Sequence, residues 1–181
     1  MHLLSKKTKK TKKKFFYLYY IIIANEMNII SFIFKILFVL TPLILGFTTS
    51  AFFKPSEWYK NLKKPEYIPP SNVFSIVWSI LYLLFGISMY YGIYYKKFIY
   101  WIIPIIHLIA NLLFSPIMFG INNLFLAFII TIITLITCIM IIWQLYITKS
   151  NNMSIYLLVP YLLWLIFATY LAHDTYMLNK K

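Results

Sequence analysis

The sequence predicts an all-α integral membrane protein, built as a bundle of five transmembrane helices. Hydrophobic residues make up 62% of the 181 positions and charged residues only 12%, which is too apolar for a soluble domain of this size. The charged residues also separate long uncharged stretches, and a helix needs about 20 apolar residues to cross the hydrocarbon core. A membrane β-barrel would need many stretches that alternate apolar and polar residues, and the sequence shows none.

The uncharged stretches place the expected helices in order. Residues 36–53, 67–95 and 150–173 carry no formal charge over 18, 29 and 24 positions, so each holds one crossing. Residues 98–148 form a stretch of 51 in which His107 is the one side chain that titrates near neutral pH, and this length fits two crossings joined by a tight turn at 120–123. The expected spans are 32–53, 72–95, 99–119, 123–147 and 155–178, within a membrane domain at 29–181.

A lysine-rich extension, residues 1–28, precedes this domain. Seven of the seventeen lysines lie between Lys6 and Lys14. The apolar stretch Phe15–Ala24 that follows is too short to span and fits an interfacial segment or a signal-like region. A domain that starts near Met27, preceded by a targeting extension or an annotation artefact, is an equal alternative.

The basic charge points to membrane lipid as a partner and not to nucleic acid, because no folded soluble module accompanies the lysines. Cytoplasmic loops are enriched in lysine, but the count here depends on the extension. With it the amino-terminal side holds ten lysines against six, and without it three against six. The lysine count alone therefore leaves the orientation open.

Three motifs carry the functional signal. Trp58–Gly86 reads WYKNLKKPEYIPPSNVFSIVWSILYLLFG and joins a basic, aromatic loop to an uncharged helix. Asn111–Gly120 reads NLLFSPIMFG, and Pro160–Thr169 reads PYLLWLIFAT. The loop has three prolines within six positions, and proline fixes φ and disfavours helix in the residue before it. A stiff loop before the second span is therefore expected.

All three motifs resemble those of the translocator protein family, also called tryptophan-rich sensory proteins or peripheral benzodiazepine receptors. They cover roughly Phe32 to Asn179, and three matches at family-like spacing make convergence a poor explanation. The resemblance implies a five-helix bundle that binds tetrapyrroles (porphyrin, haem) and cholesterol, forms homodimers and has the orientation obtained without the extension. It also implies the mitochondrial outer membrane in a eukaryote and a cell envelope membrane in a bacterium.

The third expected span carries a polar stripe, because His107, Asn111 and Ser115 recur every four residues. Polar groups inside a span need partners, so the stripe makes interhelical hydrogen bonds or lines a ligand cavity. The resemblance implies the cavity for Asn111 and Ser115, and His107 stands where the family more often has glutamine. Histidine can ligate haem iron, but we expect His107 to be neutral and to face the cavity or a neighbouring helix.

Aromatic side chains provide the expected walls of this cavity. Large residues recur from Phe74 to Phe85 at spacings of four, four and three, so they share one helix face. On the last span Trp164 lies one turn before the small Ala168, which suits a flat ligand with Trp78 as the opposite wall. The candidate ligand-binding residues are Trp58, Tyr59, Trp78, Tyr82, His107, Asn111, Ser115, Trp164, Phe167 and Ala168.

The loop at 54–71 is the expected lid of the cavity, with lysines that meet the propionates of a tetrapyrrole. Its Trp58 fits an interfacial aromatic belt equally well, as do Trp101 and Trp143. A weak cholesterol pattern is met by Leu171, Tyr176 and Lys180. The chain departs from the family at Ala172 and Phe114, where asparagine and tryptophan are usual, and these departures bear on sterol affinity and pocket shape.

Catalytic and metal-binding machinery is missing from the sequence. No phosphate-binding loop, zinc spacing or nucleophile–base pair occurs among its three glutamates, one aspartate and lone Cys138. The expected activity is therefore binding, in a receptor or translocator-like role that requires no cofactor. Two alternatives remain, namely an enzyme-like breakdown of porphyrin through Trp78 and Trp164, and a membrane scaffold without a ligand.

Overall fold

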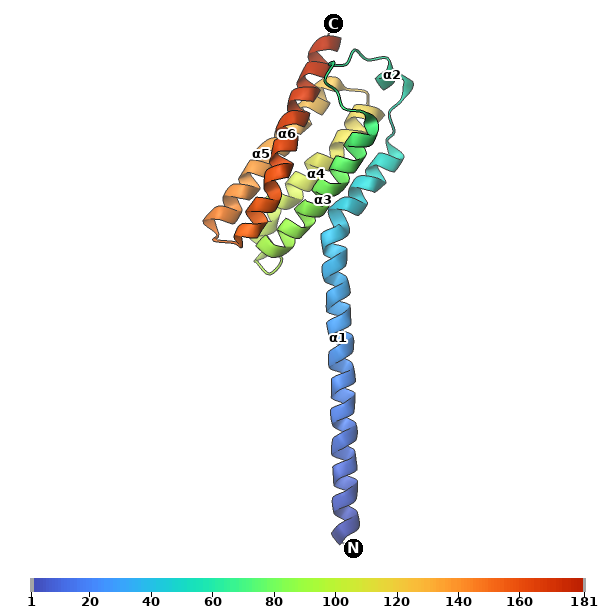
Figure 1. The fold of residues 1–181 in the computed structure, drawn as a ribbon, viewed down its shortest axis with the longest axis vertical. Helices are drawn as coiled ribbons and strands as arrows, with labels where there is room; N and C mark the ends of the chain where they lie inside the picture. The colour runs from blue at the N-terminus through green and yellow to red at the C-terminus, as the bar shows by residue number, and fades with distance from the viewer. Residues whose placement is uncertain (1, 181) are drawn as a thin grey trace. The chain divides into compact units, whose positions relative to one another are not determined.

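Helices form all of the regular structure in the described part of the chain (Figure 1). The structure, a computed structural model, describes the backbone of residues 2–180 and the side chains of residues 27–180. The lysine-rich segment at 6–14 and the apolar stretch at 15–24 therefore lie outside the described side chains. The helices are α1 (His2–Phe52), α2 (Glu57–Lys60), α3 (Ser71–Ile93), η1 (Phe98–Trp101), α4 (Ile102–Ser115), η2 (Pro116–Gly120), α5 (Leu124–Ile147) and α6 (Asn152–Asn179).

Five helical segments are long and apolar enough to cross a membrane, which confirms the predicted all-α membrane fold. They are Met27–Phe52, Ser71–Ile93, Phe98–Gly120, Leu124–Ile147 and Asn152–Asn179. The third is not one regular α-helix, because it starts with the 3₁₀ turn η1 and ends in the π-helical turn η2. Pro116 has no N–H to donate, and its carbonyl accepts from the Ile121 N–H at 2.9 Å, which closes the wider turn.

The chain divides into two compact units, residues 1–38 and 39–181. The first unit is helical from His2 onward. The segment expected as the first span, 32–53, is thus the last part of a much longer helix, α1. The second unit holds the other helices and the site described below.

Within the second unit, α6 packs against α3 and α5, and α5 also packs against α4. Two glycines of α3 allow close helix approach, as small residues commonly do in membranes. A Cβ at Gly86 would overlap the carbonyl oxygen of Val39 of α1, and one at Gly92 would overlap the Leu145 side chain of α5. Larger residues at these two positions would push the helices apart.

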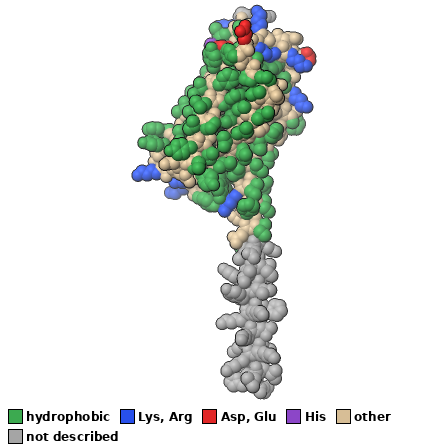
Figure 2. All heavy atoms as spheres, viewed as in Figure 1, with side chains coloured by type: hydrophobic (Ala, Val, Ile, Leu, Met, Phe, Trp, Pro, Cys, Tyr) green, Lys and Arg blue, Asp and Glu red, His purple; other side chains and the backbone are tan. Residues whose placement is uncertain are grey.

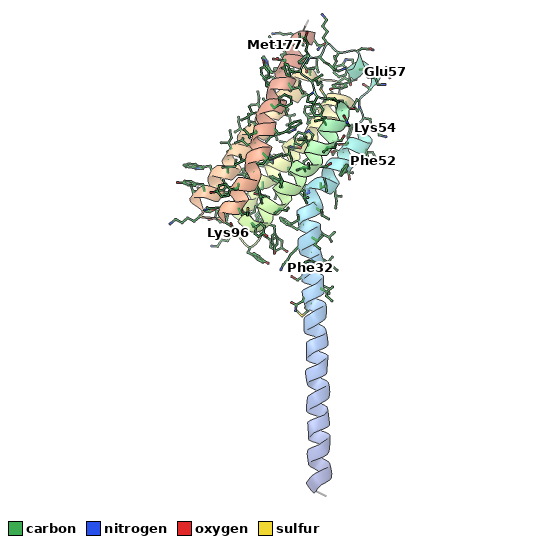
Figure 3. All side chains as sticks on the ribbon, in the orientation of Figure 1. Phe32, Phe52, Lys54, Glu57, Lys96 and Met177 are labelled. Atoms are coloured by element: carbon green, nitrogen blue, oxygen red, sulfur yellow. The ribbon has the colours of Figure 1, made fainter. Side chains whose placement is uncertain are left out.

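The bundle has two chemically different ends. Lys54, Glu57 and Met177 lie at one end and Lys96 at the other (Figure 3). We call the first the loop end, formed by residues 54–71 and the end of α6, and the second the turn end, formed by the connections at 94–98 and 148–151. On the face shown in Figure 2, hydrophobic side chains cover the flanks, while lysines gather at both ends and acidic side chains at one.

Candidate ligand-binding site

Polar side chains from four helices form a continuous hydrogen-bond chain inside the bundle. Tyr82 of α3 donates its hydroxyl to Asn111 Oδ1 of α4 at 2.6 Å, and Asn111 Nδ2 donates to the Tyr161 hydroxyl of α6 at 2.7 Å. The Tyr161 oxygen lies 2.9 Å from His107 Nε2, and His107 Nδ1 lies 2.9 Å from Thr137 Oγ1 of α5. Four of these five residues are buried and Tyr82 is half-buried, so the chain links α3, α4, α5 and α6 away from solvent.

The donors and acceptors fix the direction of this chain. Thr137 donates its hydroxyl hydrogen to a backbone carbonyl one turn earlier at 2.8 Å, so its oxygen accepts from His107 Nδ1–H. The other ring nitrogen, Nε2, is then the acceptor for the Tyr161 hydroxyl. The Tyr161 oxygen in turn accepts from Asn111, whose carbonyl oxygen accepts from Tyr82. One assignment with a neutral imidazole therefore satisfies every link.

His107 is the centre of this chain and is completely buried, with 0% of its surface exposed. Phe85 of α3 stacks on the imidazole, with ring centroids 5.1 Å apart. Because both ring nitrogens are hydrogen-bonded, ligation of iron would break one of these bonds. Ser115, the last member of the polar stripe, is half-buried at the end of α4 and does not join the chain.

The aromatic face of α3 is turned toward α4 and α6, as its spacing predicts. Each of its four large side chains has one polar or aromatic partner on those helices. The pairs are Phe74 with Trp164, Trp78 with Tyr161, Tyr82 with Asn111, and Phe85 with His107. The ring that meets Trp164 is thus Phe74, while Trp78, the expected opposite wall, lies against Tyr161 one turn deeper in the bundle.

Trp164 lies in an aromatic layer between the polar chain and the loop end. Phe74 meets its ring edge-on at 5.8 Å, and Phe167 lies 5.3 Å away on the same helix. The indole Nε1 is buried and has no hydrogen-bond partner among the described residues. Ala168 follows one turn later and is half-buried. A buried N–H without an acceptor costs free energy. This layer would therefore favour a ligand that carries a hydrogen-bond acceptor.

Tyr67 fastens the loop to the end of α6. Its hydroxyl donates to Asp174 Oδ2 at 2.6 Å, and its ring stacks on Tyr170 at 5.6 Å. Desolvation and the hydrogen bond to the Asp174 carboxylate raise the pKa of the Tyr67 phenol, which keeps its proton available. The other Asp174 oxygen lies 2.9 Å from His173 Nδ1. Adjacent side chains diverge on an ideal helix, yet His173 and Asp174 lean toward one another beside the loop.

A second set of hydrogen bonds, made by Asn179, attaches the loop to α6. The side chain of Asn179 accepts from the Lys63 N–H at 3.0 Å and donates to the Lys63 carbonyl at 2.8 Å. The backbone N–H and the backbone carbonyl of Lys63 are thereby both paired with the last turn of α6. The loop is consequently bound to α6 at two points, through Tyr67 and through Lys63.

We expect removal of the hydrogen bonds made by Tyr67 and Asn179 to open the loop. Combining Tyr67→Phe with Asn179→Ala removes the three hydrogen bonds between the loop and α6, each worth about 1 kcal/mol or a factor of about 5 in the open population. A lysine-specific protease should therefore cleave at 60–64 at least about tenfold faster in the double variant. Tyr95→Phe, at the exposed turn end, is the matched control and should cleave like the parent. Unchanged cleavage in the double variant would show that other contacts hold the loop.

Tyr59 of the loop faces the π-helical turn. Tyr59 meets Phe119 of η2 edge-on at 5.0 Å, and Lys64 Nζ lies 4.8 Å above the Tyr59 ring. Burial raises the pKa of Tyr59. Trp58 is half-buried on α2. The loop therefore contacts η2 through Tyr59 and α6 through Tyr67, and it bridges the two sides of the bundle at this end.

The residues of the cholesterol pattern do not form a common outer surface. Leu171 is 7% exposed and points into the bundle. Tyr176 is half-buried against Phe128 of α5, with ring centroids 6.4 Å apart, and Lys180 Nζ lies 6.0 Å from its ring. Among the described residues no three His, Cys, Asp or Glu side chains come together as a metal site requires.

Sequence reasoning missed several residues that organise the site, namely Tyr161, Thr137, Tyr67 and Asn179. Tyr161 belongs to the third motif, and a signal for it was present, because a hydroxyl in mid-span needs a partner. Tyr67 and Asn179 left no such signal. Their partners lie 107 and 116 residues away along the chain.

Comparison with known proteins places the chain among relatives of one kind. The sequence model of the TspO/MBR family matches residues 38–177. A tryptophan-rich protein TspO of Archaeoglobus fulgidus is 35% identical over 84% of this chain and 99% of its own length. A tryptophan-rich protein TspO of Bacillus cereus is 31% identical over 67% of this chain and 80% of its own. A translocator protein homolog of Schizosaccharomyces pombe is 28% identical over 77% and 88%.

Proposed function

Because the chain belongs to the TspO/MBR family, we propose that it is a membrane receptor or translocator-like protein that binds a tetrapyrrole at the loop end of its bundle. The ligand is a porphyrin or haem, and no cofactor is needed for binding. It lies against the aromatic layer of Phe74, Trp164 and Phe167, below the loop at 54–71.

The observation that carries this proposal is the state of Trp164. Its ring belongs to a layer of aromatic side chains from two helices, and planar apolar ligands gain from stacking and burial against such rings. Its buried N–H lacks an acceptor among the described residues, and the carboxylates or ring nitrogens of a tetrapyrrole are acceptors. The deeper polar chain, in contrast, satisfies its own groups and needs no ligand.

The loop supports the charged part of the ligand. Lys54 and Lys63 are exposed and make none of the described ion pairs, while Lys60 is paired with Glu57 at 2.7 Å. Exposed lysines near the aromatic layer can meet the propionates of a porphyrin at the membrane surface. Because the loop is bound to α6 through Tyr67 and Lys63, these lysines are held at the end of the bundle where the ligand enters.

The family resemblance leads us to propose two further properties, namely that the protein forms homodimers and that it binds sterols. The position of Leu171 inside the bundle gives the sterol pattern little surface with which to contact cholesterol, so tetrapyrrole is the ligand class that we put first. The resemblance also leads us to propose that bound ligand is handed on rather than consumed.

Titration of the purified protein with protoporphyrin IX tests the proposal. We expect quenching of tryptophan fluorescence, a shifted Soret band and release of unchanged porphyrin, whereas protein-free micelles should give neither change. A new chromophore after illumination or oxidant would instead support breakdown of porphyrin through Trp78 and Trp164. No spectral change at all would overturn the proposal and leave a scaffold role.

A further inference from the structure

We propose that the turn end of the bundle holds a binding site for the phosphate headgroup of an anionic phospholipid. The site consists of Lys96, Lys97 and Lys149 together with the tyrosines around them. It lies at the other end of the bundle from the loop and is independent of the tetrapyrrole proposal.

Hydrogen bonds hold the two connections of this end side by side. Ser150 donates its hydroxyl to the Gly92 carbonyl of α3 at 3.1 Å, so the connection after α5 is joined to the end of α3. Lys149 has a left-handed backbone, with φ of 48°, and its N–H donates to the Tyr146 carbonyl at 3.1 Å. Lysine is unusual at such a position, which favours glycine or asparagine. The backbone that carries Lys149 is therefore fixed next to the segment that carries Lys96.

The charge at this end is uncompensated in the described residues. Lys96, Lys97 and Lys149 are exposed, and neither of the described ion pairs includes them. Among the residues with described side chains, 27–180, the three acidic ones all belong to the loop end, namely Glu57, Glu66 and Asp174. The lysines of the loop end, by contrast, are partly engaged within the protein, since Lys60 pairs with Glu57 and Lys64 lies over Tyr59.

Four tyrosines lie at the end of α3 and just after it, next to Lys96 in the chain. Tyr94 and Tyr95 meet edge-on at 4.8 Å, and Tyr90 lies 5.1 Å from Tyr94. Tyr95 is 77% exposed and Tyr91 52% exposed. Tyrosine rings prefer the membrane interface, with the ring among acyl chains and the hydroxyl in the headgroup layer. The hydroxyls of the exposed Tyr91 and Tyr95 can donate to a phosphate whose charge the lysines neutralise.

A bilayer lipid fits this arrangement better than a soluble phosphate. Figure 2 shows hydrophobic side chains over the flank of the bundle and lysines at its ends, and Figure 3 places Lys96 at the turn end. A lipid can therefore place its chains on the flank and its headgroup among the lysines. Basic residues next to membrane helices attract anionic lipid in this way. A free phosphate would have only exposed, screened charges to bind.

Native mass spectrometry of the full chain in neutral detergent, titrated with phosphatidylglycerol or phosphatidylcholine, tests the site. The triple variant Lys96→Gln, Lys97→Gln, Lys149→Gln should bind phosphatidylglycerol about 10- to 100-fold more weakly and phosphatidylcholine unchanged. The control, Lys54→Gln, Lys60→Gln, Lys63→Gln, removes the same charge at the loop end and should lose less than about threefold. Both variants keep the lysines between Lys6 and Lys14, so any contribution of these cancels.

Two results would overturn the inference. Equal losses in the two triple variants would mean that only the total charge matters. If glycerol phosphate displaced the lipid and bound with the same affinity as phosphatidylglycerol, the site would be one for soluble phosphate. Melting temperatures of the variants in detergent should match, because all six lysines are exposed and replacing their side chains leaves the core intact.

Discussion

Replacement of His107 by leucine should destabilise the bundle by about 2–4 kcal/mol. The change leaves the Tyr161 hydroxyl without its acceptor and the Thr137 oxygen without its donor, and each buried unpaired group costs about 1–3 kcal/mol. Bonds between membrane helices are individually weaker, about 1 kcal/mol, which sets the lower part of the range. Unfolding in mixed micelles of increasing denaturing detergent, followed by circular dichroism, measures the loss.

Glutamine at position 107 is the matched control. Its side-chain oxygen can accept from Tyr161 and its amide can donate to Thr137, so the direction of the chain survives. We expect a loss of less than about 1 kcal/mol. If His107→Leu were as stable as His107→Gln, the chain would not stabilise the bundle. Loss of low-spin axial bands from bound haem in His107→Gln would make this residue an iron ligand instead.

The spans could be predicted because their signal is local. Uncharged stretches bounded by residues such as Lys54 and Glu66 have the length of a crossing, and backbone groups in lipid must be satisfied within a helix. The aromatic face of α3 was predictable for a similar reason, since spacings of three and four place side chains on one face. Both inferences need only the sequence of one segment.

The partners of that face could not be predicted in the same way. Whether Phe74 or Trp78 meets Trp164 depends on how far α3 is shifted along α6. That shift is set by packing at several places, including the close approach at Gly92. A shift of one turn exchanges one aromatic partner for the next, and no pattern within α3 records it.

The pairing of His173 with Asp174 shows the limit of helix geometry as a guide. Adjacent side chains diverge by about 100° on an ideal helix, which favours no contact. Tyr67 of the loop orients the Asp174 carboxylate, because its hydroxyl binds one oxygen of Asp174 and leaves the other facing His173. The partner lies in a loop far away in the sequence, so local geometry could not include it.

We thus propose that stability and ligand binding depend on different layers of the same bundle. The polar chain around His107 is satisfied within the protein, and its loss should affect folding first. The aromatic layer around Trp164 keeps a buried N–H unpaired, and its loss should affect binding first. Variants in the two layers can therefore separate the two properties.

Replacement of Trp164 by alanine should weaken protoporphyrin binding by about 1–3 kcal/mol, or roughly 5- to 150-fold in Kd, because it removes a stacking surface and its buried area. Quenching of the remaining tryptophans reports the affinity. Trp164→Phe keeps one aromatic ring but removes the pyrrole ring with its N–H, so it should weaken binding less than alanine does and still bind more weakly than the parent. Trp143→Ala is the matched control, since Trp143 is 62% exposed on α5, and it should bind like the parent. A folded Trp164→Ala protein with a Kd within about twofold of the parent would remove Trp164 from the site, and with it the observation on which tetrapyrrole binding at the loop end depends.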